Sequence, residues 1–155
     1  MRSVIVSDTT ALIILSKLHR FDLLSNLFER VVLPRVVYEE LTVKESVELP
    51  DFFEIHQQST PISFDLLVLD AGEAAAIALA EQLQLPLLID EKKGRRIAQA
   101  RKLVIFGTLG LIIANTKRGY LTQDEAIQLI DRLASVNFRL SENLLTEAKA
   151  IITAC

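Results

Sequence analysis

Short runs of β-branched and apolar residues alternate with longer helical patterns along this chain, and this alternation constrains the fold more than any other feature. Residues 3–7 read Ser-Val-Ile-Val-Ser, which is typical of a buried strand. Further strands are expected at 31–33, 52–56 (an edge strand), 86–89 and 104–106. Apolar residues at helical spacing predict helices at 11–18, 21–28, 34–41, 71–83, 91–101, 109–117, 123–135 and 142–152. This order predicts an α/β fold, a three-layer α/β/α sandwich around a five-stranded, mostly parallel sheet.

Length and composition fit one domain spanning residues 1–155, with a core at about 3–118 and C-terminal helices at about 121–153. The longest apolar stretch, 103–114, is shorter than the ~20 residues that cross a bilayer, so no membrane partner is expected. The only cysteine is Cys155, which cannot form an internal disulfide, and a cytoplasmic location is expected. The net charge of −3 leaves room for a local basic patch.

Acidic residues follow two of the predicted strands. Asp8 comes directly after the first strand and Asp90 directly after the strand ending at residue 89. Because ligands of such sheets bind beyond the carboxyl ends of parallel strands, these two acids are expected to share a site. Glu73 lies in the first turn of the alanine-rich helix, and Glu40 lies beside apolar residues of the helix after Pro34. Glu39 points about 100 degrees away from Glu40 on that helix, and the choice between them stays open.

Four sequence blocks, in order, resemble those of PIN domains, most of all a prokaryotic subgroup of uncharacterised PIN-like proteins. They are Val-Ser-Asp-Thr-Thr at 6–10, Pro-Arg-Val-Val-Tyr-Glu-Glu-Leu at 34–41, Asp-Ala-Gly-Glu followed by an alanine-rich run at 70–80, and Leu-Ile-Asp-Glu-Lys-Lys-Gly-Arg-Arg-Ile-Ala at 88–98, with a Gly-Thr-Leu-Gly block at 107–110. The resemblance implies a PIN-like fold and an Mg²⁺- or Mn²⁺-dependent nuclease in which Asp8, Glu40, Glu73 and Asp90 bind the metal and carry out catalysis. It also implies an RNA substrate, expected to be single-stranded, and relatives that act as toxins of toxin–antitoxin pairs, so an antitoxin protein and a homodimer are expected partners. Many PIN domains have aspartate where this chain has Glu73.

The chemistry of phosphodiester hydrolysis suits a carboxylate site. Mg²⁺ and Mn²⁺ prefer oxygen ligands, activate bound water and neutralise phosphate charge. Two carboxylates ~5 Å apart repel by roughly 3 kcal/mol at an effective dielectric constant of 20, so four in one pocket need a cation or protons. We therefore expect an endoribonuclease, with a non-catalytic nucleic-acid-binding or protein-interaction module on the same fold as the alternative.

Each of the acids also has an ordinary structural explanation. Asp8 and Asp90 are suited to cap the helices that follow them, Asp70 and Glu73 have the spacing of a capping box, and Glu40 fits a solvated helix face. A phosphatase with an aspartate nucleophile is disfavoured, because the second acid it needs is replaced by Thr10.

A basic cluster begins beside Asp90, and it predicts contacts to a phosphate backbone by Lys92, Lys93, Arg95 and Arg96. A solvated helix face explains the same residues. Thr9 is a candidate to support the metal site, and Thr108 is expected to cap the helix at 109–117. Few aromatic side chains are expected to be exposed for base stacking, and Phe52, Phe53 and Tyr120 are the candidates.

Overall fold

The structure is a computed structural model that describes residues 3–155. Within them, one sheet contains β1 (Val4–Ser7), β2 (Arg30–Pro34), β3 (Phe53–His56), β4 (Leu87–Leu88) and β5 (Ile105–Phe106). The strands lie in the order β3-β2-β1-β4-β5, and every neighbouring pair is parallel. The predicted α/β class and five-stranded sheet are confirmed, and the sheet is fully rather than mostly parallel.

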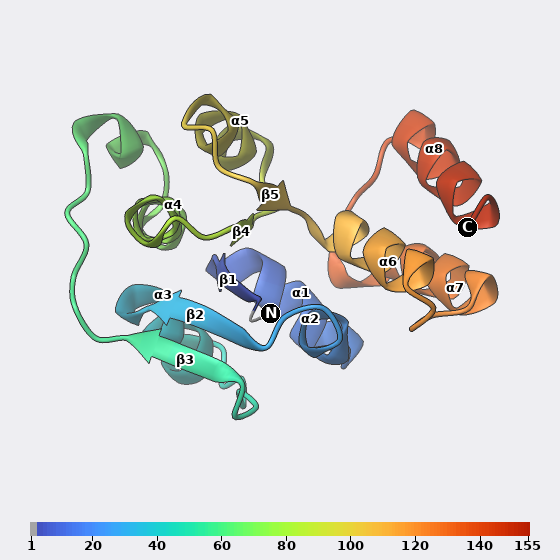
Figure 1. Cartoon of the computed structure of the whole chain (residues 1–155), viewed down its shortest axis with the longest axis horizontal. Coiled ribbons are helices and arrows are strands. Elements are labelled where there is room, and N and C mark those ends of the chain that lie inside the picture. The colour runs from blue at the N-terminus through green and yellow to red at the C-terminus, as the bar shows by residue number, and fades with distance from the viewer. Residues whose placement is uncertain (1–2) are drawn as a thin grey trace.

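The helices alternate with these strands, as the sequence pattern predicts. They are α1 (Thr9–Leu18), α2 (Asp22–Ser25), α3 (Arg35–Glu39), α4 (Ala71–Leu83), α5 (Lys92–Ala100), α6 (Thr108–Lys117), α7 (Gln123–Leu133) and α8 (Glu142–Thr153). A π-helical turn, Glu40–Lys44, continues α3, and 3₁₀ turns occupy Phe64–Val68 and Ala134–Val136. Figure 1 shows the sheet in the middle of the molecule, with helices on both faces.

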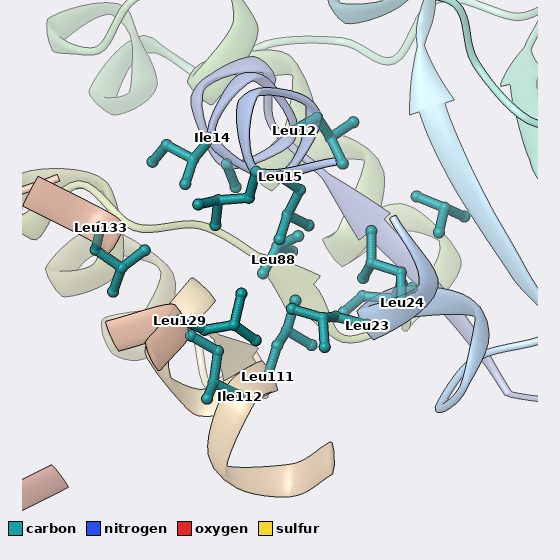
Figure 2. Packing of buried hydrophobic residues seen from close by; sticks show 14 of the residues in the cluster. Leu12, Ile14, Leu15, Leu23, Leu24, Leu88, Leu111, Ile112, Leu129 and Leu133 are labelled. Atoms are coloured by element: carbon teal, nitrogen blue, oxygen red, sulfur yellow. The ribbon is translucent and has the colours of Figure 1, made fainter. Parts of the chain in front are cut away.

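Successive residues of β1 point to opposite faces of the sheet, and each face has its own apolar core. Ile5 belongs to a cluster with residues of α1, α2, α6, α7 and α8, whereas Val6 belongs to a cluster with α4 and α5. In Figure 2, Leu15 of α1, Leu88 of β4 and Leu111 of α6 meet within the first cluster. The two cores hold the central strands between two helical layers.

The order of the strands reverses beside β1. The chain moves outward from β1 through β2 to β3, and then returns to the other side of β1 to form β4 and β5. Ser7 pairs with Leu88, so β1 and β4 end side by side. This is the topological switch point at which open α/β sheets bind ligands.

None of the helices in residues 3–155 is both long and apolar enough to span a membrane.

Candidate metal centre

Asp8 lies at the switch point with its side chain fully buried. Its backbone amide donates to the Leu88 carbonyl at 3.2 Å, which ties the end of β1 to the end of β4. The carboxylate Oδ1 accepts from the Ala11 amide at 3.2 Å and so caps α1. Oδ2 is buried without a hydrogen-bond partner in the described structure. Asp8 therefore caps a helix, as the ordinary explanation has it, and still presents one free oxygen.

The environment of Asp8 is unfavourable to a negative charge. Burial raises the pKa of the Asp8 carboxyl well above its usual value, and the charges of Asp90, Glu73 and Asp70 raise it further. The hydrogen bond from the Ala11 amide acts in the opposite direction and does not offset this. Three carboxylates thus act electrostatically on a fourth, as expected for acids that share a site.

Asp90 is held in place by the start of α6. Its Oδ1 accepts from the Thr108 amide at 2.7 Å, and its Oδ2 accepts from the Thr108 hydroxyl at 2.6 Å. The expectation that Thr108 caps the helix was wrong: Gly107 is the N-cap residue, and Thr108 is the first helical residue. Because both donors of Thr108 are directed at Asp90, Thr108 orients this carboxylate. Burial raises the pKa of Asp90, whereas Thr108 and Arg95 lower it.

Glu73 is the most conspicuous acid of the site. Only 3% of its surface is exposed, and its Oε2 has no hydrogen-bond partner in the part of the chain that the structure describes. Asp70 caps α4 by accepting from the Glu73 amide at 2.8 Å, but the reciprocal bond of a capping box is not found among the described residues. Burial, followed by Asp70 and Glu91, raises the pKa of Glu73 from 4.5 to about 8.

Glu40 faces the site, and its neighbour Glu39 faces solvent. Glu39 pairs with Arg35 at 4.0 Å on the exposed side of α3. Glu40 begins the π-helical turn, a feature that is frequent at functional sites. Its Oε1 lies 2.9 Å from where a Cβ on Gly72 would be, and the Thr9 hydroxyl lies 2.8 Å from the same point. Burial raises the pKa of Glu40, and so does the charge of Asp70. Of the two alternatives, only Glu40 is oriented toward the other acids.

The tightest group of acids includes two residues that the sequence reasoning missed. Asp70, Glu73 and Glu91 each offer an oxygen atom within 4.8 Å of the others, and no other such group occurs in residues 3–155. The spacing of Asp70 fits a helix cap, and Glu91 directly follows the predicted ligand Asp90. Both lie at helix N-terminal caps, where the backbone N–H groups favour negative charge. That position is the sequence signal that could have identified them.

The donor set fits a hard divalent cation. All the atoms gathered here are oxygens, and the buried Asp8 Oδ2 and Glu73 Oε2 have no partner among the described residues. A buried carboxylate without a hydrogen bond is costly, and a cation or a proton offsets that cost. Of the four predicted ligands, only Glu73 belongs to the close group with Asp70 and Glu91. Asp8 lies outside that group and is affected by the charges of Asp90, Glu73 and Asp70, and Glu40 is affected by the charge of Asp70. Mg²⁺ and Mn²⁺ prefer such ligands, whereas sites for zinc usually contain cysteine or histidine.

The basic residues of α5 have different roles. Arg95 donates to the Ile89 carbonyl at 3.3 Å, and Lys93 donates to the Val68 carbonyl at 3.3 Å. Lys92 and Arg96 are exposed beside the acid site. Arg101, at the end of α5, bonds to Asp65 and Glu81 at 2.7 Å and connects the helix to neighbouring segments. Lys92 and Arg96 are therefore the members most available to a ligand.

The chain is thus an α/β protein with an all-parallel sheet and carboxylates at its switch point. A family model with the description DUF3368: PIN domain matches residues 4–153. The chain belongs to this family, and PIN domains are commonly metal-dependent nucleases.

A solved structure supports the same fold. The chain resembles a PilT N-terminus domain protein from the hyperthermophilic archaeon Sulfolobus solfataricus P2, with a TM-score of 0.53 and 12% sequence identity. The alignment covers 72% of this chain and 92% of that protein. At this identity the likeness concerns the fold alone. No curated protein was found to match the sequence.

Proposed function

We propose that this protein is a ribonuclease that requires Mg²⁺ or Mn²⁺ and hydrolyses phosphodiester bonds of RNA. The observation that carries the proposal is the pair of buried carboxylate oxygens, Asp8 Oδ2 and Glu73 Oε2, that have no partner in the described structure. They lie in a centre whose other members are carboxylates as well. Membership in a PIN domain family supports the same reading, because PIN domains are commonly metal-dependent nucleases.

Individual residues would share the work of this site. Asp8, Glu73 and Asp90 are the proposed metal ligands from the sequence blocks, with Glu40 as the fourth and Asp70 and Glu91 as additions from the structure. When bound, the cation would supply an activated water and neutralise charge on the phosphate. Thr108 fixes the orientation of Asp90 through two hydrogen bonds. Arg95, which lies beside Asp90, would limit the repulsion between the site and a phosphate.

The experiment compares RNA cleavage by the purified protein and by single variants in the presence of Mn²⁺. Asp8→Asn and Glu73→Gln should each lower the rate by more than about 100-fold, because loss of a direct ligand should exceed the 10–100-fold typical of groups behind the ligands. Cleavage should leave 5′-phosphate and 3′-hydroxyl ends. Calorimetry should show the same two variants binding Mn²⁺ more weakly.

Neighbouring residues of one helix supply the matched control. Glu40→Gln should lose activity, whereas Glu39→Gln should retain it, because Glu39 is on the exposed side and pairs with Arg35. Equal activity in these two variants would contradict the assignment of Glu40. A protein that binds RNA but cleaves none with Mn²⁺, and that binds no Mn²⁺, would instead be a non-catalytic module on the PIN fold.

A role as the toxin of a toxin–antitoxin pair, with an antitoxin partner and a homodimeric state, remains a prediction from the sequence. Growth arrest on expression that disappears with Asp8→Asn would support it.

A further inference from the structure

A groove leads away from Asp90 along the edge of the sheet. It has a volume of about 690 Å³ and runs between α5, the outer strand β5, α6 and the segment that enters α8. Figure 1 shows β5 with α5 on one side and α8 on the other. Asp90 lines the groove, so the groove opens directly onto the acid site.

Both walls of this groove carry positive charge. Lys92, Arg95 and Arg96 line it from α5, and Arg139 lines it from the segment before α8. Arg96 and Arg139 are exposed, and neither takes part in an ion pair found within residues 3–155. Asp90 is the only acid among the lining residues. In a chain with a net charge of −3, this concentration of free cations predicts an anionic ligand.

The floor of the groove is apolar and contains aromatic rings. Phe106 is held by an edge-to-face contact with Phe28 at 5.6 Å between ring centroids. Phe138 is half-buried and has no ring contact within the described part of the chain. Gly110 lines the groove, and a Cβ on it would have no heavy atom within 4 Å. Phe138 packs against the apolar core and lines the same groove as Gly110, where open space leaves room for a planar group.

Cations for phosphates and a ring for a base are the features that bind single-stranded nucleic acid. We propose that this groove binds the strand of single-stranded RNA adjoining the phosphate to be cleaved, with Arg96 and Arg139 contacting phosphates and Phe138 stacking on a base. The inference rests on the proposed function, because it takes RNA as the substrate. It adds Arg139 and Phe138, which come from the C-terminal segment and not from the basic cluster of α5. It also replaces Phe52 and Phe53 as stacking candidates, because Phe53 packs on both Phe52 and Phe21.

Binding is tested without cleavage, by fluorescence anisotropy of labelled single-stranded RNA in EDTA. Phe138→Leu should weaken binding by roughly 5- to 150-fold, the equivalent of one lost stacking contact, without changing the salt dependence. Arg139→Ala should weaken binding and reduce the slope of log affinity against log salt by about 0.7, the value for one phosphate contact to a single strand. Arg118→Ala, at the far end of α6, is the matched control and should bind as the unmodified protein does.

Gly110 offers a test that does not remove any contact. Gly110→Glu and Gly110→Gln place side chains of nearly equal size in the same open space, and only the first is charged. Gly110→Glu should bind RNA at least several-fold more weakly than Gly110→Gln. Thermal unfolding of both variants and of Phe138→Leu verifies that the fold is intact.

The outcomes separate this inference from the proposed function. Unchanged RNA affinity in Arg139→Ala, Phe138→Leu and Gly110→Glu would overturn the groove assignment, even if cleavage still depended on Asp8. Groove-dependent binding without any Mn²⁺-dependent cleavage would support the groove and contradict the nuclease. The protein could instead bind duplex RNA, or an extended peptide that adds a strand to β5, more tightly than single-stranded RNA. If the same variants weakened that binding, the inference would also be overturned.

Discussion

Single carboxylates reveal most about this protein when their burial and their hydrogen bonds are considered together. Asp8 and Glu73 are both buried, and each has an oxygen with no partner in the described structure. Capping explains one oxygen of Asp8 but nothing about the other, and it does not explain Glu73 at all. A buried carboxylate oxygen without a hydrogen bond is typical of a site in which a bound ligand neutralises the charge of the carboxylate.

The raised pKa of Glu73 predicts how the metal-free protein responds to pH. The folded protein holds a proton on Glu73 up to about pH 8, whereas the unfolded chain loses it near 4.5. Between these values the folded state binds more protons than the unfolded state, so the free energy of unfolding should fall as the pH rises. The expected loss is on the order of a few kcal/mol, measured by chemical unfolding in EDTA.

Two comparisons check this assignment. Glu73→Gln should make stability less dependent on pH, with the remaining slope due to Asp8, whose pKa is also raised. Glu147→Gln, on the exposed surface of α8, should follow the unmodified protein. With saturating Mn²⁺ the free energy of unfolding should instead rise with pH, because the cation then replaces the proton on Glu73. The same dependence of stability on pH in Glu73→Gln and in the unmodified protein would contradict a raised pKa of Glu73.

At the scale of elements, glycines allow the helices to approach the acids. Gly72 of α4 lies against Glu40, Gly94 of α5 lies against Glu73, and Gly107 before α6 lies against Asp90. A Cβ at these positions would come within 2.9 Å of the respective carboxylate oxygen. Each of these three carboxylates thus meets a glycine from another element, and only Gly72 and Gly94 belong to sequence blocks that also carry an acid.

Gly94 and Gly110 form a matched pair for testing this role, since each is the third residue of its helix. Alanine at Gly94 would come within 2.6 Å of Ile89 Cδ1 and 2.8 Å of Glu73 Oε2, whereas alanine at Gly110 meets open space. Replacing glycine by alanine gains about 1 kcal/mol of helix propensity at both positions. The difference in unfolding free energy between the two variants therefore isolates the overpacking cost at Gly94, about 1–3 kcal/mol. Gly94→Ala should be the less stable variant in urea unfolding and should bind Mn²⁺ more weakly than Gly110→Ala. Equal stability and equal Mn²⁺ affinity of the two variants would contradict a close approach of α5 to Glu73.

Across the whole molecule, the C-terminal helices complete the core beneath the sheet. Leu129, Ile130 and Leu133 of α7 and Ile152 of α8 belong to the same apolar cluster as Leu15 and Leu111. Asn115 of α6 adds a polar connection, since its Nδ2 donates to the Leu23 carbonyl at 2.9 Å and its Oδ1 accepts from Asn26. The region at 121–153 therefore packs as part of the fold and forms one wall of the groove.

Removal of these helices should abolish stable folding. Full burial of a leucine or isoleucine contributes about 1.5–3 kcal/mol, so four of them amount to on the order of 10 kcal/mol, similar to the whole stability of a typical domain. A chain ending at Arg118 should lack a cooperative thermal transition by circular dichroism. A chain ending at Thr153, which keeps α8, should unfold like the full protein. Cooperative unfolding of the shorter chain would refute this expectation.

Local pattern determined the elements of this protein and the acids at the strand ends. Apolar periodicity and caps act over a few residues, so the helix Ala71–Leu83 and the positions of Asp8 and Asp90 beyond β1 and β4 could be predicted from the sequence. Only the tertiary structure decided which donors and acids meet across elements. Thr108 bonds to Asp90 across two elements. Asp70 and Glu91 lie close to Glu73, and Arg139 lines the same groove as α5. These contacts depend on how helices distant in sequence pack together, and no local spacing carries that information.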